Sequence, residues 1–208
     1  MTAHAVITGD IVNSTRLGMT KEKKLVKIIQ HVLALYKLEF YRGDSFQAYL
    51  KDARVAMKSA LLCRTAAISI SQAIGGSASS DVRMSIGIGQ VKTPVKKLST
   101  AKGEAFVLSG RAFDEITKND TRLSITTGNR LANEGLQVIA DYINAIFKEM
   151  TGKQAAVIFE LLKGRTQQDA AKKLKKSKST INQHVSSGKW AEIEKLLQQY
   201  ENIINQIS

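Results

Sequence analysis

A change of hydrophobic periodicity near residue 150 is the feature that most constrains the fold of this 208-residue chain. Before it, residues 1–127 alternate between short β-branched runs and segments whose apolar side chains recur every three or four residues. That alternation is typical of helices covering a sheet. From Thr151 onward every periodic segment is helical. We therefore expect an α+β domain over residues 1–150 and an all-α domain over residues 151–208, joined through a long helix.

The predicted elements of the first domain follow the order strand, helix, hairpin, helix, strand, which is close to the ferredoxin-like arrangement. Gly43 and Asp44 separate two strand-like runs and predict a hairpin turn. We expect an antiparallel sheet with its helices on one side. The predicted strands span residues 5–9, 38–42, 45–50, 82–89 and 122–127, and the predicted helices span residues 21–37, 53–73, 103–117 and 129–150, with Gly75, Gly76 and Ser77 ending the second helix.

The composition is that of an ordinary globular protein, with 43% hydrophobic and 24% charged residues. A single cysteine, Cys63, excludes an internal disulfide framework and favours a reducing compartment. No apolar run approaches the ~20 residues that cross a bilayer, and the N-terminal sequence lacks a signal-peptide pattern, so we expect a cytoplasmic protein with no membrane partner. The net charge of +13 favours a polyanion such as nucleic acid, although nucleotide phosphates or solubility would also explain it.

The most basic part of the chain, residues 165–178, extends over a pair of short predicted helices. Thr166 and Asp169 form a capping box that begins the first helix, and Ser177 caps the second. Two short helices with a tight turn describe a helix-turn-helix, in which Ile181 would pack inward. The alternative is a three-helix bundle whose basic face is only solvated. The residues predicted to contact DNA are Lys172, Lys173, Lys176, Lys178, Ser179, Asn182, Gln183 and Ser186.

Residues 166–185, with the sequence TQQDAAKKLKKSKSTINQHV, resemble the helix-turn-helix of LuxR-type regulators and of sigma-factor region four. The shared features are a threonine-glutamine start, an alanine, a leucine and a serine-x-serine-threonine run. Lys176 departs from that pattern, because an apolar residue is usual there. The resemblance implies double-stranded DNA as a partner. A last helix over residues 190–207 has heptad spacing, which favours packing onto the preceding helices or a homodimer that reads paired half-sites.

Two aspartates form a second candidate site. Asp10 ends the first predicted strand and Asp44 lies at the predicted hairpin, and in a ferredoxin-like sheet these strands can be neighbours. Paired carboxylates repel one another unless a cation lies between them, and hard oxygen ligands suit Mg²⁺ or Mn²⁺ carrying a nucleotide phosphate. The alternative is that Asp44 only forms the turn and that Asp10 only caps or solvates the end of the strand.

Four blocks resemble, in order, the motifs of class III nucleotidyl cyclases: AVITGDIVNST at 5–15, YRGDSFQ at 41–47, RMSIGIGQV at 83–91 and GEAFVLSGR at 103–111. The resemblance implies an active site formed between two chains. It assigns metal binding to Asp10 and Asp44, transition-state stabilisation in an active enzyme to Arg111, and phosphate contacts to the backbone of Asn13, Ser14 and Thr15.

Two positions depart from the cyclase pattern. Phe40 stands where the purine-reading lysine belongs, and Val107 replaces the ribose-binding asparagine. Cyclisation needs the ribose 3'-hydroxyl to be aligned with the α-phosphate. Positioning of this kind can lower the activation free energy by roughly several kcal/mol. These departures imply ligand binding without turnover. The cyclase blocks followed by a helix-turn-helix are similar, over nearly the whole chain, to the SatD family.

We therefore expect a DNA-binding transcriptional regulator whose degenerate, cyclase-like domain senses a nucleotide or related phosphorylated ligand with a divalent metal. An alternative is an active metal-dependent nucleotidyl cyclase or another nucleotide phosphoryl-transfer enzyme. A third possibility is that the first domain is only a dimerisation platform and that DNA contact is the whole function.

Overall fold

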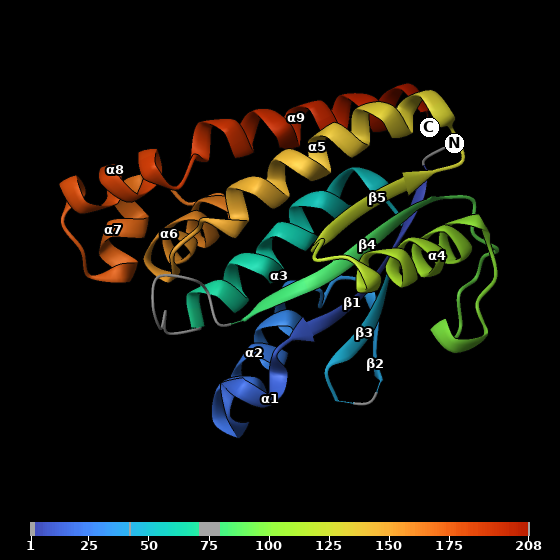
Figure 1. The fold of residues 1–208 in the computed structure, drawn as a ribbon, viewed down its shortest axis with the longest axis horizontal. Coiled ribbons are helices and arrows are strands. Elements are labelled where there is room, and N and C mark those ends of the chain that lie inside the picture. Colours follow the sequence, from blue (N-terminus) through green and yellow to red (C-terminus); the bar gives the residue numbers. More distant parts are fainter. Residues whose placement is uncertain (1–2, 42, 71–79, 208) are drawn as a thin grey trace.

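A five-stranded sheet with helices on both faces forms the centre of the computed structural model, which describes residues 3–41, 43–70 and 80–207 (Figure 1). The strands are β1 (His4–Val12), β2 (Lys37–Tyr41), β3 (Ser45–Leu50), β4 (Asp81–Gly89) and β5 (Leu123–Thr127). The α-helices are α1 (Ser14–Leu17), α2 (Met19–Val32), α3 (Ala56–Ile70), α4 (Glu104–Lys118), α5 (Arg130–Lys148), α6 (Gly152–Leu162), α7 (Gln167–Leu174), α8 (Lys178–Ser187) and α9 (Trp190–Ile207), and short 3-10 turns η1 and η2 span Ala53–Val55 and Leu98–Thr100.

The sheet has the strand order β2-β3-β1-β4-β5. Its first four strands pair antiparallel, as expected for the strand-helix-hairpin-helix-strand order. The fifth strand corrects the prediction of a wholly antiparallel sheet, because β5 runs parallel to β4. A parallel neighbour requires a crossover connection, and α4 forms part of the connection between β4 and β5. The sheet is therefore mixed.

The helices lie on both faces of the sheet, whereas the sequence predicted helices on one side only. Successive residues of a strand point to opposite faces. Accordingly, Ala5 and Ile7 of β1 join the main core with α2, α3 and α5, while Val6 joins a smaller cluster with Ala105 of α4. At Gly87, a Cβ atom would collide with the backbone of α4, so only glycine allows this close approach. The helix α4 thus covers part of the second face.

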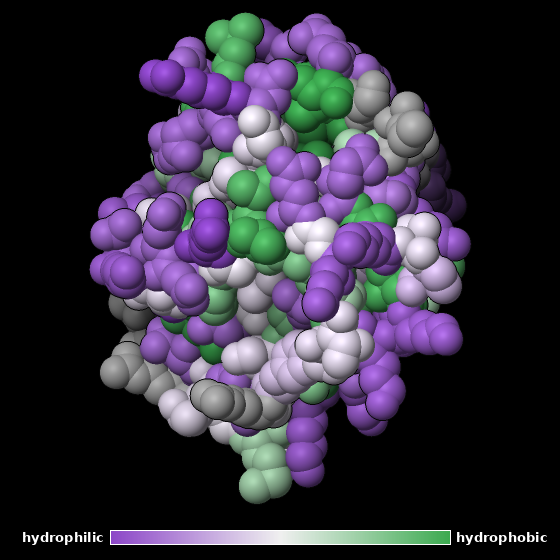
Figure 2. All heavy atoms as spheres, turned by 90° about the vertical axis from the view of Figure 1, so that its right-hand side faces the viewer, coloured by the Kyte–Doolittle hydropathy of each residue, from purple (hydrophilic) through white to green (hydrophobic). Residues whose placement is uncertain are grey.

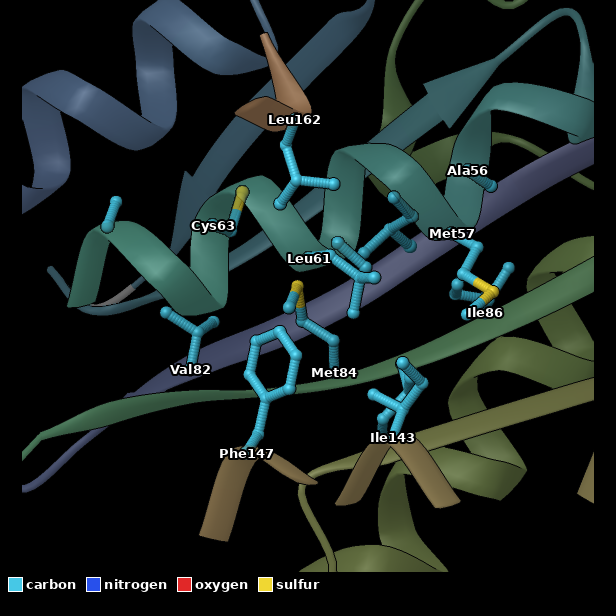
Figure 3. Close-up of a cluster of buried hydrophobic side chains, with 14 of the residues drawn as sticks. Ala56, Met57, Leu61, Cys63, Val82, Met84, Ile86, Ile143, Phe147 and Leu162 are labelled. Carbon is cyan, nitrogen blue, oxygen red and sulfur yellow. The ribbon is translucent and has the colours of Figure 1, made fainter. Parts of the chain in front are cut away.

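The main core contains residues from both sides of position 150. Figure 3 shows Leu61 and Cys63 of α3 between Leu162 of α6 and the side chains of β4 and α5. The helix α3 packs against both α6 and β4. A second connection is made by Tyr200 of α9, whose buried hydroxyl donates a 2.6 Å hydrogen bond to the carbonyl of Ala53. Burial of these apolar side chains therefore ties the C-terminal helices to the sheet.

Long helices form the outer layer above the sheet. The helices α5 and α9 run side by side, and α7 and α8 lie at one end of the molecule, at the left in Figure 1. The opposite end faces the viewer in Figure 2, where hydrophilic side chains predominate and hydrophobic ones are scattered among them. No helix in the described ranges combines the length and the apolar character needed to cross a membrane.

Most predicted elements occur with shifted ends. The helix expected over residues 21–37 is α2, which begins at Met19 after Gly18 and ends at Val32. The backbone φ of +74° at Gly18 separates α2 from the four-residue helix α1, which the sequence did not predict. The last part of the helix expected over residues 53–73, and the glycines expected to end it, lie outside the described residues.

Candidate functional site

The pairing of β1 with β3 brings the two candidate aspartates together. Asp10 lies opposite Ser45, the residue directly after Asp44. The backbone N–H of Ile11 donates a 3.2 Å hydrogen bond to the carbonyl of Asp44. The charge of Asp44 raises the pKa of Asp10, which requires the two carboxylates to lie within electrostatic reach of one another. Asp10 and Asp44, called here the carboxylate pair, thus share one end of the sheet although 33 residues separate them in the sequence.

The Asp10 carboxylate lies in an environment that disfavours its ionised form. Burial raises the pKa of Asp10 above its ordinary value and outweighs the opposing effect of Arg83, while Asp44 raises it further. Its Oδ1 atom is buried and has no hydrogen-bond partner among the described residues. An ionised buried oxygen without a partner is costly. The Asp10 carboxylate therefore gives an electrostatic reason for an additional positive group at this site.

The segment from Asn13 to Thr15 follows β1 directly, but its three side chains differ in placement. Ser14 is buried, and its hydroxyl donates a 2.9 Å hydrogen bond to Oδ2 of Asp44. Asn13 is exposed with a left-handed backbone, and Thr15 is exposed. Ser14 therefore holds Asp44 in place, whereas the predicted phosphate contacts of the three backbone groups stay a prediction.

Two arginines that the sequence analysis missed complete this end of the sheet. Arg83 lies opposite Asp10 in the β1–β4 register, with its Nη1 atom 3.7 Å from Oδ2 of Asp10. Arg122 directly precedes β5, and both arginines oppose the rise in the pKa of Asp10. We call Asp10, Arg83 and Arg122 the charged row. The alternation of strand residues is the sequence signal that places Arg83 on the polar face, but the register that aligns it with Asp10 comes only from the fold.

The remaining cyclase-derived positions lie elsewhere. Arg111 is on the exposed side of α4. Within the described residues, it forms no hydrogen bond or ion pair with Asp10 or Asp44. Val107, one turn earlier on α4, is 49% exposed. Phe40 packs against the main core, with its ring 5.4 Å from that of Phe46, so it faces away from the carboxylate pair. A single chain therefore gathers the aspartates but not Arg111.

The carboxylate pair fits a magnesium or manganese ion that a phosphorylated ligand helps to bind. Within the described ranges, no group of three or more histidine, cysteine, aspartate or glutamate side chains could hold a metal by itself. Magnesium, however, is commonly bound through only one or two carboxylates, with water and substrate phosphates as its other ligands. The unpartnered Oδ1 atom of Asp10 and the neighbouring Asp44 carboxylate supply oxygen donors of that kind.

The second candidate site is the surface of α7 and α8, called here the basic helix pair. The side chain of Thr166 accepts a hydrogen bond from the N–H of Asp169, and that of Ser177 accepts one from Thr180, so both predicted caps are present. Ile181 is fully buried, as expected for the inner side of α8. Each residue predicted to contact DNA is exposed: Lys172, Lys173, Lys176, Lys178, Ser179, Asn182, Gln183 and Ser186.

Comparison with models of known protein families and with curated proteins gives no match. Among solved structures, the chain is similar to a bacterial light-regulated adenylyl cyclase, with a TM-score of 0.42 and 12% identity, covering 60% of this chain and 76% of that one. It is also similar to the active GGEEF domain of a diguanylate cyclase from Vibrio cholerae, with a TM-score of 0.41 and 14% identity, covering 62% of this chain and 85% of that one. Similarities of this size do not show what this chain binds or catalyses.

Proposed function

We propose that this protein is a DNA-binding regulator whose sheet binds a nucleotide or related phosphorylated ligand together with Mg²⁺ or Mn²⁺. The observation that carries the ligand-binding part is the buried, unpartnered Oδ1 atom of Asp10 beside Asp44. A divalent cation between the two carboxylates would offset the burial that raises the pKa of Asp10. The order of the four cyclase-like blocks and the basic helix pair also supports, as part of this proposal, a place in the SatD family.

The DNA-binding part of the proposal rests on the exposed side of the basic helix pair. Asn182 and Gln183 lie next to one another on α8, and amide side chains can pair with two atoms of an adenine edge in the major groove. Lys172 and Lys173 on α7 suit phosphate oxygens, which position a protein on the duplex without reading its sequence. The C-terminal helices would thus form a helix-turn-helix reader.

The two activities would be coupled through packed helices and a homodimer. The helix α6 contacts both α8 and α3, and α3 contacts β4, which carries Arg83. In the proposed dimer, the partner subunit's Arg111 would face the carboxylate pair. Ligand binding changes the spacing of two DNA readers only if the ligand prefers one dimer arrangement over another. The proposal therefore requires that the ligand and DNA alter each other's affinity.

Calorimetric titration with a nucleoside triphosphate and Mn²⁺ tests the ligand site. We expect heat of binding with the wild-type protein and its loss in Asp10→Ala and Asp44→Ala. Asp114→Ala is the matched control, because Asp114 is exposed on α4. Equal affinity in all four proteins would reject the ligand site. If DNA binding and regulation also survived the loss of both aspartates, the sheet would be a dimerisation platform only.

An active nucleotide enzyme is the second candidate, and the retained carboxylate pair is the observation that favours it. Incubation of the protein with Mn²⁺ and each of the four nucleoside triphosphates, followed by mass analysis, separates catalysis from binding. A cyclic product that disappears in Arg111→Ala would establish a cyclase. Unchanged triphosphates, combined with measurable binding heat, would establish a sensor.

A further inference from the structure

The charged row lies at one end of the sheet, with Asp10 on β1, Arg83 on β4 and Arg122 directly before β5. Asp10 of β1 lies opposite Arg83 of β4. Arg83 and Arg122 directly precede the first register pair of β4 and β5, Met84 opposite Leu123. Met84 and Leu123 belong to the main core, so the residues before them point to the other face, where Asp10 also lies. One carboxylate and two guanidinium groups therefore follow one another along the same face.

The two arginines are not fully neutralised by their neighbours. Their side chains are only 18% and 22% exposed. Nε of Arg83 and Nη1 of Arg122 are buried and find no hydrogen-bond partner in the described chain. The ion pair of Arg83 with Asp10 is long, at 3.7 Å, and Arg122 pairs at 2.8 Å with Asp120, which is 85% exposed. Like charges side by side on a sheet are destabilising, so an anion that accepts both N–H groups would stabilise this arrangement.

We propose that Arg83 and Arg122 form a binding site for the phosphate groups of the ligand, next to the metal held by Asp10 and Asp44. This inference rests on the proposed function for the metal and adds the residues that bind the anion. A guanidinium group donates charge-assisted hydrogen bonds to phosphate oxygens, often two at a time. The two arginines would thus bind the anion of a phosphorylated ligand, while the carboxylate pair would hold its metal.

The position of the site distinguishes it from the phosphate contacts expected at the end of β1. The hydroxyl of Ser14 is already used to hold Asp44. Arg83 and Arg122 instead come from β4 and from the connection between α4 and β5, so they lie on the side of β1 away from β3 and Asp44. A single chain supplies both halves of this site, and Arg111 is not required for the anion to bind.

Titration of the full-length protein with inorganic pyrophosphate, without metal and at about physiological ionic strength, tests the anion half. We expect Arg83→Gln and Arg122→Gln to bind pyrophosphate about ten- to a hundredfold more weakly than the wild type, as the loss of a charged hydrogen bond predicts. Arg130→Gln, which changes an exposed arginine at the start of α5, is the matched control. Affinity in the two row variants equal to that of the control would overturn the proposal.

Asp10→Asn should increase the affinity for pyrophosphate, and misfolding could not cause such an increase. Because Asp10 competes with the anion for Arg83, this variant should bind pyrophosphate more tightly than the wild type when metal is absent. Weaker metal-free binding would contradict the proposed pairing. Mn²⁺ affinity, measured separately by electron paramagnetic resonance, should fall in Asp10→Asn and stay near the wild-type value in Arg122→Gln. Mn²⁺ affinity unchanged by Asp10→Asn would reject the metal site of the proposed function and leave the arginine result standing.

Discussion

The hydroxyl of Ser14 donates a 2.9 Å hydrogen bond to Oδ2 of Asp44 across 30 residues of sequence. The serine is buried at the start of α1, whereas its neighbour Thr15 is exposed. This contact fixes the orientation of one member of the carboxylate pair. A ligand-supporting hydrogen bond of this kind commonly affects metal affinity even though the donor never touches the metal.

Ser14→Ala should therefore weaken Mn²⁺ binding by about tenfold, less than the loss caused by Asp44→Ala. Thr15→Ala is the control, because it removes a hydroxyl one residue away from an exposed position. The measurement is the Mn²⁺ dissociation constant from electron paramagnetic resonance. Equal affinity in Ser14→Ala and Thr15→Ala would show that the Asp44 orientation does not depend on Ser14.

Two ion pairs of similar length test how burial changes the contribution of an ion pair to the free energy of unfolding. Arg64 binds Asp81 at 2.6 Å and is 1% exposed, whereas Arg54 binds Asp52 at 2.7 Å and is 50% exposed. Arg64 also donates a hydrogen bond to Asn144. Arg64→Ala should lower the free energy of unfolding by about 3–5 kcal/mol, because it leaves Asp81 without its cation in a largely buried place.

Arg54→Ala, the matched control, should lower the free energy of unfolding far less, since water can replace the exposed guanidinium group beside Asp52. Urea denaturation of both variants measures the difference. If the two substitutions cost the same, the buried contacts of Arg64 contribute no more than an exposed pair.

The basic helix pair predicts two different DNA phenotypes. Asn182→Ala with Gln183→Ala should relax sequence preference, because in the proposed helix-turn-helix these exposed side chains would read base edges. Lys172→Ala with Lys173→Ala should weaken binding to every sequence and reduce the salt slope by about one unit per lysine. Binding isotherms on selected and scrambled duplexes at several salt concentrations measure both effects. The reverse pattern would place α7, and not α8, in the groove.

His184 predicts a pH dependence of stability. Burial lowers the pKa of His184 below 6.5, and Lys153 and Lys176 lower it further. At pH values between the lowered pKa and 6.5, the unfolded state therefore binds more protons than the folded state. The contribution of His184 to the free energy of unfolding is fully present above pH 6.5 and is lost as the pH falls through the lowered pKa.

His184→Gln should accordingly reduce the loss of unfolding free energy between pH values of about 7.5 and about 5.5. Chemical denaturation at the two pH values measures this loss. His31→Gln, at an exposed position on α2, controls for the removal of a histidine. An identical loss in the wild type and His184→Gln would mean that His184 contributes nothing to the pH dependence.

Much of the fold could be predicted from the sequence because its local signals agree with its packing. The turn at Gly43 and Asp44 joins β2 to β3, and the periodicity over residues 190–207 forms α9 within those bounds. The direction of β5 could not be predicted in the same way. The amphipathic pattern of α4 shows that one side of the helix is buried, but it does not show which face of the sheet it covers.

The site was predictable only where a residue carries a strong local motif. Asp10 follows the apolar run of the first predicted strand and Asp44 lies at the predicted turn, so their meeting could be expected, although β1 continues past Asp10 to Val12. Arg83 lies within an ordinary strand, and Arg122 lies just before another. Their place beside Asp10 depends on which distant strands pair and in which register, and this pairing cannot be read from the local pattern of either strand.

The helix α3 packs with one side against the sheet and with another against α6. Residues before and after position 150 therefore cover apolar surface that would otherwise be exposed to water. Deleting residues 151–208 would remove Leu162, which packs over Leu61 and Cys63. The apolar side of α3 would then be exposed to solvent and would promote aggregation. The sheet and the C-terminal helices should therefore unfold together, in one cooperative step. A chain built in this way cannot lose its C-terminal helices without weakening the packing around its sheet.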